Sequence, residues 1–323
     1  MPLFKNLIAY RIAPEWTAPP LDQLEAEMQR LAFQPCGATQ ELSVGWLPPR
    51  GEDHGAMVEN VGGHWIMQLG IERKAVPGGA VRQELEARCK AIEASQGRKP
   101  GRKEKAELKE EIIHTFLPRA FSKRSSHRIW VDVERGLLLV GAGSTRAAEA
   151  VLKPLGDLMA DLRHVLSLSL LSTATSPAVA MAHWLTSREA PAGFTVDRDL
   201  ELKNTGEERS VVRYARHTLE LDEIGQHIQE GKLPTQLAMT WEGKVSFVLT
   251  EALVLKKIEL IDVDKNLGKD NGFDADATIA TAELSELLPQ LLLALGGEQA
   301  FGVPSAPAPG AVTPSEETAD ADF

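Results

Sequence analysis

This 323-residue chain has only two cysteines, and it lacks long apolar runs and a surplus of positive charge. Cys36 and Cys89 lie far apart without metal-ligand spacing, which excludes a disulfide framework and is typical of a reducing compartment. No run approaches the roughly 20 apolar residues that a membrane helix needs. The first six residues lack the apolar region and cleavage site of a signal peptide. We therefore expect a cytoplasmic protein that does not contact membranes.

Complete motifs for catalysis, metal binding and nucleotide binding are also absent from the sequence. H-E-x-x-H, G-x-x-x-x-G-K-[ST] and G-x-S-x-G do not occur, and eight histidines are scattered without ligand spacing. Residues 262–266 begin like a calcium loop, but Leu267 replaces the required glycine and Phe273 the bidentate glutamate. Arg146 replaces the third glycine of a dinucleotide fingerprint. We expect no catalytic residue, metal or cofactor, and a plain strand-to-helix turn at 141–143.

The remaining pattern indicates an α+β fold with mixed or antiparallel sheets and flanking helices. A hydrophobic content of 43% can fill a sizeable core. We divide the chain into an N-terminal α+β unit (1–75), a basic helical hairpin with its following strand (76–135), a central α+β part (136–190), a C-terminal α+β unit (191–300) and a disordered acidic tail (301–323). Within the central part, the pattern predicts a helix over 147–155 and a strand over 162–170.

Two amphipathic helices joined by a short basic loop predict a projecting hairpin. Val81, Leu85 and Cys89 form an apolar stripe on the first helix, and turn formers at 96–103 interrupt the pattern. Lys99, Arg102 and Lys103 make the tip positive. Two explanations stay open for this tip: a contact for a polyanion, or a solvated and flexible connection.

The segment 117–130 concentrates positive charge in a chain whose formal net charge is -11. It carries Arg119, Lys123, Arg124 and Arg128 and contains no aspartate or glutamate. If residues 123–133 form a strand, Lys123 lies on one face and Arg124 and Arg128 on the other. The run has two explanations. It is either a strand edge kept cationic against aggregation or a surface for a polyanion, with Phe121 as one possible stacking ring.

A second basic group follows at Arg213, Arg216 and His217. Glu207 and Glu208 dilute it, so a charged sheet face explains it as well as a ligand contact does.

Six segments, taken in order, resemble one bacterial family. They are Phe4-Lys5-Asn6-Leu7 with Tyr10-Arg11, Phe33-x-Pro35-Cys36-Gly37, Gly45-Trp46-x-Pro48-Pro49-x-Gly51, Leu117-Pro118-Arg119-Ala120-Phe121-Ser122, Phe273-Asp274-Ala275-Asp276 and Ala294-Leu295-Gly296-Gly297-Glu298. With these segments the chain resembles the RdgC family of recombination-associated proteins over about residues 1–300.

This resemblance implies a ring-shaped homodimer that binds double- and single-stranded DNA through a positively lined hole, without sequence preference. It also implies that the protein limits RecA-driven strand exchange by competing for DNA, is associated with the nucleoid, and is not an enzyme. A ring would let an acidic protein hold a polyanion, because its cations face inward and its acids outward.

We assign phosphate contacts to Arg119, Lys123, Arg124 and Arg128. Secondary contacts are assigned to the remaining cations: Lys99, Arg102, Lys103, Arg213 and Arg216. Phe121 either stacks on a base or closes the ring against the partner subunit, and we favour the second, with Arg216 and His217 at the same contact. Two other classes remain: a module that restrains RecA by direct protein contact without DNA, and an enzyme with a hidden carboxylate site.

Overall fold

The computed structural model describes residues 3–52, 54–204, 210–216, 219, 221–261 and 272–303. It has an α+β fold, as predicted, in which helices flank a twelve-stranded sheet whose named strands all pair antiparallel. The strands are β1 Asn6–Ile12, β2 Leu42–Leu47, β3 Val58–Val61, β4 His64–Lys74, β5 Ser122–Asp132, β6 Leu137–Val140, β7 Leu168–Leu170, β8 Phe194–Asn204, β9 Val211–Tyr214, β10 Lys232–Trp241, β11 Val245–Thr250 and β12 Leu255–Leu260. The helices are α1 Leu21–Arg30, α2 Gly78–Gln96, α3 Arg102–Phe116, the 3-10 turn η1 Leu117–Arg119, α4 Thr145–Asp161, α5 Pro177–Ser187, α6 Leu221–Gln229 and α8 Gly272–Ala294.

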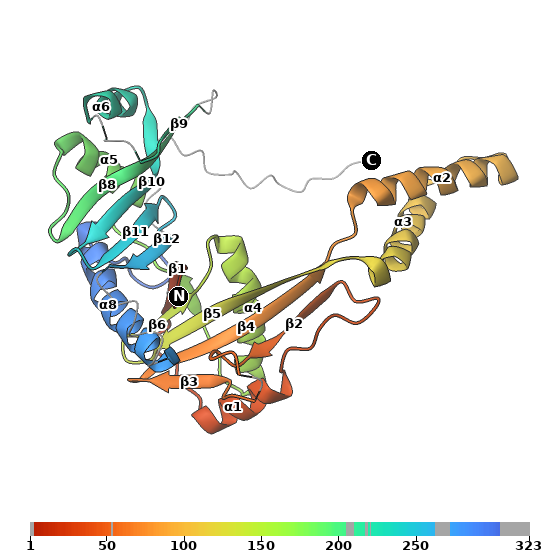
Figure 1. Ribbon diagram of the computed structural model, residues 1–323, viewed down its shortest axis with the longest axis horizontal. Coiled ribbons are helices and arrows are strands. Elements are labelled where there is room, and N and C mark those ends of the chain that lie inside the picture. Colours follow the sequence, from red (N-terminus) through yellow and green to blue (C-terminus); the bar gives the residue numbers. More distant parts are fainter. Residues whose placement is uncertain are drawn as a thin grey trace.

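The sheet follows the order β2-β4-β5-β6-β1-β12-β11-β10-β8-β9, with β3 added to β4 and β7 added to β1. The N-terminal strand β1 therefore joins its two parts. Ile8 pairs with Val140 of β6, and Leu7 pairs with Leu255 of β12. Figure 1 shows that the chain forms an arc. Strands β8 to β12 with α5 and α6 stand at one end and the α2–α3 hairpin at the other, with β5 on the open side.

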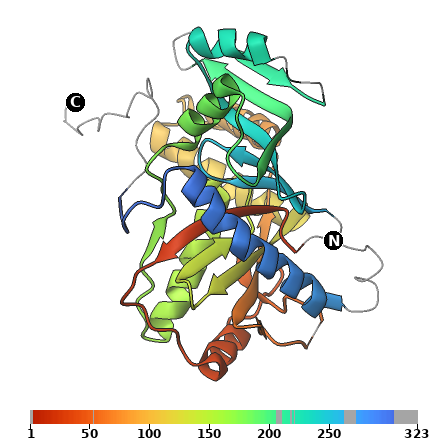
Figure 2. The same cartoon turned by 90° about the vertical axis from the view of Figure 1, so that its left-hand side faces the viewer.

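Two apolar clusters occupy opposite faces of the sheet. The first contains Trp130 and Trp241 and is covered by α5, α6 and α8; Figure 2 shows α8 crossing strands from both parts of the sheet. The second contains Trp46 and Leu158 and is covered by α1 and α4. Alternating side chains of a strand point to opposite faces, so single strands such as β1 and β5 supply both clusters.

The predicted helical hairpin is confirmed. Helix α2 ends at Gly97, whose φ of 65° suits glycine because the left-handed region has no Cβ penalty for it. Val81 and Ile112 are the buried residues of α2 and α3, and the rest of both helices is more open to solvent. Figure 1 shows the pair projecting from the ends of β4 and β5. Among the described helices, none combines the length and apolarity required to span a membrane.

The prediction of a strand over residues 162–170 was correct only at its end. Helix α4 continues through Pro154 to Asp161, six residues beyond the predicted end, and Arg163 then takes a left-handed conformation with φ of 61°. Only Leu168–Leu170 forms a strand, because the helix end and the left-handed Arg163 occupy the first part of the segment; Leu162, Leu166 and Leu168 all pack against the second cluster. The strand-to-helix turn at 141–143 is confirmed, and Ser144 caps α4 by accepting from the Ala147 backbone N–H. The disordered tail predicted for residues 301–323 lies outside the described residues from position 304 onward.

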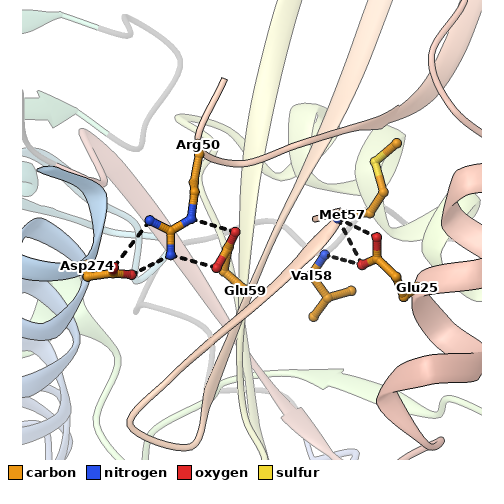
Figure 3. A network of polar contacts seen from close by, with 6 residues as sticks. All are labelled: Glu25, Arg50, Met57, Val58, Glu59 and Asp274. Atoms are coloured by element: carbon orange, nitrogen blue, oxygen red, sulfur yellow. Dashed lines mark hydrogen bonds and ion pairs between the residues drawn. The ribbon is translucent and has the colours of Figure 1, made fainter. Parts of the chain in front are cut away.

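Arg50 ties the loop after β2 to β3 and to α8 (Figure 3). Its Nε donates to Glu59 Oε1 at 2.6 Å and its Nη2 to Asp274 Oδ1 at 2.6 Å. Its guanidinium also lies 5.1 Å from the ring centroid of Phe273. These hydrogen bonds raise the pKa of Arg50. In the same view, Glu25 of α1 accepts from the Met57 and Val58 backbone N–H groups at 2.9 Å and fixes the start of β3.

A second ion pair joins β1 to the segment that follows α8. Arg11 of β1 donates from Nε and Nη2 to the two carboxylate oxygens of Glu298, at 2.7 and 2.5 Å. Such a bidentate pair fixes orientation as well as distance. The segment after α8 is thereby held against the first strand.

Gly45 marks a close backbone approach. A Cβ built there would lie 2.4 Å from Phe33 Cα, because the Phe33 N–H donates to Trp46 O at 2.8 Å and holds the two segments together. No side chain fits at this position without backbone movement.

We expect Gly45→Ala to lower the free energy of unfolding by about 1–3 kcal/mol, the usual cost of overpacking. The check is a urea titration followed by circular dichroism. Gly156→Ala is the matched control, because a Cβ there meets nothing within 4 Å and alanine is the better helix former. Equal midpoints for both variants would contradict the close approach.

Candidate nucleic-acid interface

Strand β5 runs from solvent into the core, as its sequence predicts. Residues 122–126 are exposed, His127 and Arg128 are half-buried, and residues 129–132 are buried. The exposed half lies beside the root of the hairpin and pairs with the end of β4. The side chains of residues 122–126 are exposed, although Ile71 and Glu72 of the paired part of β4 are partly or fully buried.

The two outermost cations of β5, Lys123 and Arg124, lie on opposite faces of the strand. Lys123 stands directly opposite Arg73 of β4, a cation facing a cation. Arg124 stands opposite Glu72, and its guanidinium lies 4.2 Å from the ring centroid of Phe33. Arg124 therefore makes a cation–π contact with an aromatic ring, while Lys123 and Arg73 form a two-charge group on the other face.

Arg128 lies four residues further along β5, about 13 Å from Arg124 at 3.3 Å per residue. It shares a face with Arg124, as predicted. Its Nη1 donates to Leu3 O at 2.9 Å, and its Nε is buried without a hydrogen-bond partner among the described residues. Burial lowers the pKa of Arg128, and the charge of Asp276 opposes this effect. Arg128 is thus set back from the exposed end of the strand.

Arg119 and Phe121 lie at the junction between α3 and β5. Arg119 ends η1 and is exposed. Phe121 is 93% exposed, an unusual position for so large an apolar side chain.

The hairpin tip carries exposed cations in a mixed setting. Lys99 Nζ lies 3.8 Å from Glu93 Oε1, while Arg102 and Lys103 are exposed in the first turn of α3. The structure places this group at the far end of the hairpin from β5 (Figure 1).

The second basic group lies on the other arm, since β9 is at the opposite edge of the sheet from β2. Arg213 Nε donates to Glu201 Oε2 at 2.5 Å. Arg216 is exposed, and its backbone N–H donates to Asp199 Oδ1 at 2.9 Å. His217 lies outside the described residues. The structure does not bring Arg213 and Arg216 next to β5 within one chain.

Glu201 is the anchor of this group. Burial raises its pKa, but hydrogen bonds from Lys203, Thr235 and Arg213 outweigh burial and lower the pKa to about 2. Its side chain is 7% exposed and lies 3.0 Å from Lys203 Nζ and 2.9 Å from Thr235 Oγ1. Arg213 is therefore paired with a buried carboxylate that it shares with Lys203.

Sequence reasoning missed Arg73 and Phe33. Both belong to the interface only because β4 pairs with β5 in this register and because residues 31–33 lie along β2. No local signal gave this register, because residues 75–121, which include α2 and α3, separate β4 from β5 in the sequence. Across the ranges the structure describes, no group of three or more His, Cys, Asp or Glu side chains is arranged to hold a metal ion.

The fold and these cations define an arc-shaped α+β protein with a basic strand end at the root of a projecting hairpin. A sequence model described as "Putative exonuclease, RdgC" matches residues 2–298. The chain therefore belongs to the RdgC family.

Curated relatives cover nearly the whole chain. Each is named "Recombination-associated protein RdgC". The protein of Dechloromonas aromatica (strain RCB) is 41% identical over 307 residues, which cover 91% of this chain and 98% of the relative. The protein of Herminiimonas arsenicoxydans is 43% identical over 303 residues, covering 92% and 99%. That of Janthinobacterium sp. (strain Marseille) is 42% identical over 301 residues, covering 91% and 98%. These names connect the family with recombination and do not describe an enzyme.

We expect Glu201 to make folding sensitive to acid. A depressed pKa in the folded state contributes stability above the unfolded value of about 4.3, and this stability is lost as the pH falls toward 2. Urea midpoints measured from pH 5 to pH 2 should fall more steeply for the wild type than for Glu201→Gln. Glu86→Gln, an exposed change on α2, is the control. Parallel curves for the wild type and Glu201→Gln would refute the role of this carboxylate.

Proposed function

We propose that this protein binds double- and single-stranded DNA without sequence preference, as a homodimeric ring, and thereby limits the access of RecA to DNA. The observation that carries the proposal is the cross-strand pair of Lys123 and Arg73. Like charges directly opposite on neighbouring strands destabilise a sheet. A polyanion bound between them removes that cost.

The distribution of acids supports the same surface. The chain is acidic overall, yet segment 117–130 on η1 and β5 contains no carboxylate. Arg124 stands opposite the buried Glu72 of β4, but its guanidinium lies over Phe33, a neutral ring. Affinity for DNA depends on this local field and not on the total charge.

The arc of the single chain supports a ring. In Figure 1 the hairpin and the β8–β12 end stand apart, with β5 along the open side between them. A second copy that meets the first would enclose the cations of β5, and Arg213 and Arg216 on the other arm would face the same space. Phe121, exposed at the root of the hairpin, supplies an apolar contact for the partner.

Competition for DNA then explains the link with recombination. A protein that covers DNA without sequence preference excludes RecA from it by mass action and resides with the nucleoid. Direct contact with RecA without DNA binding is the competing explanation. A gel-shift titration with unrelated duplexes separates them: sequence-independent binding supports the proposal, and its absence favours direct contact.

We expect the double variant Lys123→Gln with Arg124→Gln to bind duplex DNA with a flatter salt dependence. Each lost phosphate contact removes about 0.9 from the slope of log Kobs against log salt, so the change should be about 1.8. Fluorescence anisotropy over a salt series measures it. Arg30→Gln with Lys153→Gln removes the same charge from α1 and α4 and should leave the slope unchanged. The same slope in both double variants would remove these cations from the interface.

We expect Phe121→Ser to weaken the dimer. A buried aromatic anchor contributes about 2 kcal/mol or more, so the dimer Kd should rise roughly thirtyfold or more. Sedimentation equilibrium over a concentration series measures this change. Val165→Ser is the control, because Val165 is also an exposed apolar residue, at 82%, but lies after α4. A wild-type dimer Kd for Phe121→Ser would rule out this contact.

A further inference from the structure

A pocket of about 470 Å³ lies between the start of β1, the middle of β4 and β5, and the turn after β6. Its volume falls within the range of about 300–1,000 Å³ typical of small-ligand sites. Two glycines form one wall: a Cβ at Gly143 would lie 3.3 Å from Asn6 Nδ2, and a Cβ at Gly141 would lie 3.2 Å from Arg128 O. Side chains at either position would narrow the space.

The polar lining of this pocket consists of cations and neutral groups. Its members are Lys5, Asn6, Gln68, Ser126, His127 and Arg128, and no carboxylate is among the lining residues. Asp276, at the start of α8, acts on Arg128 through its charge but does not line the pocket. In a chain with a net charge of -11, such a lining points to an anionic ligand.

Arg128 is held ready for such a ligand. Its Nη1 is fixed by Leu3 O at 2.9 Å, while its buried Nε has no hydrogen-bond partner among the described residues. A half-buried guanidinium with one carbonyl partner gains a charge-assisted hydrogen bond from a phosphate oxygen. His127 is also fixed: its Nδ1 lies 3.1 Å from Gly141 O, and since a carbonyl accepts, this nitrogen carries the proton. A neutral ring in this tautomer adds no donor for an anion, so Arg128 carries the argument.

The pocket lining offers no aromatic face on which a nucleobase could stack. Phe4 is 2% exposed and stacks on Trp130 at 6.0 Å between ring centroids, so it offers no open ring face. Base recognition in single strands usually needs such a face. The donors of the pocket match the phosphate or the sugar of a nucleotide instead.

We propose that this pocket binds one backbone phosphate of a DNA strand. The DNA strand runs along the face of β5 that carries Arg124, Ser126 and Arg128, so that Arg124 contacts a second phosphate of the same DNA strand, about 13 Å away and not adjacent to the first. This assignment rests on the proposed function for the strand, but the phosphate chemistry stands on the pocket itself. A free nucleotide offers the same phosphate chemistry, and the experiment separates the two sources.

The test uses the full chain and two serines. Ser126→Glu places a carboxylate in the lining, whereas Ser187→Glu adds the same charge at an exposed position at the end of α5, away from β5. The probe is a fluorescein-labelled hexathymidylate at low salt, with dTMP and inorganic phosphate as competitors. We expect Ser126→Glu to weaken hexanucleotide binding at least about tenfold more than Ser187→Glu does, the value of one charge-assisted contact. Arg128→Gln, if folded by circular dichroism, should weaken it by a similar factor.

Each outcome of this experiment supports or contradicts one part of the proposal. Equal affinities of Ser187→Glu and Ser126→Glu for the hexanucleotide would overturn the pocket, even if the wild type still binds duplex DNA. If dTMP competed as strongly as unlabelled hexanucleotide, the assignment to a DNA strand would be wrong, and the ligand of the pocket would be a free nucleotide. Loss of duplex binding in the wild type itself would instead defeat the proposed function, and binding of dTMP or phosphate that depends on Arg128 would then still establish the pocket.

Discussion

The pairing of β1 with β6 on one side and with β12 on the other holds this structure together. The path of the sheet passes from one half to the other only through this strand among those described. Leu7 and Ala9 enter the first apolar cluster, and Ile8, Tyr10 and Ile12 enter the second. A strand buried on both faces and bonded on both edges cannot shift in register, because a slip of one residue would exchange its two faces. The arc therefore has a fixed geometry, and so does the spacing between its two basic regions.

The segments that make the sequence resemble its family are paired in space. Arg11 meets Glu298, Arg50 meets Asp274 and Phe273, and Gly45 lies against the backbone of Phe33. These contacts fix how the chain ends, the first loops and α8 close around the sheet. Five of the six segments thus record the construction of the fold, and the sixth, which contains Arg119 and Phe121, lies at the root of the hairpin. Most of the segments that carry the family resemblance therefore lie at contacts within the fold.

The candidate interface was predictable to the extent that it lies on one strand. Strict alternation along β5 placed Lys123 on one face and Arg124 with Arg128 on the other, because the side-chain period of a strand is two. Arg73 was not predictable as a partner of Lys123 without the register between β4 and β5. The strand expected at 162–170 failed for a similar reason: its apolar residues have a place against the second cluster, which no local pattern reveals.

The sequence by itself determined the α+β class, the basic hairpin, the acid-free strand and the family, because all four depend on local periodicity, local charge or short segments. Tertiary structure alone decided which cations stand together. It paired Arg213 and Lys203 with the buried Glu201, placed the guanidinium of Arg124 over the ring of Phe33, and placed Arg128 in a pocket with Lys5. The physical reason is that the environment of a charge is set by groups brought within a few ångströms from distant parts of the chain, and a charge count along the sequence does not contain those distances.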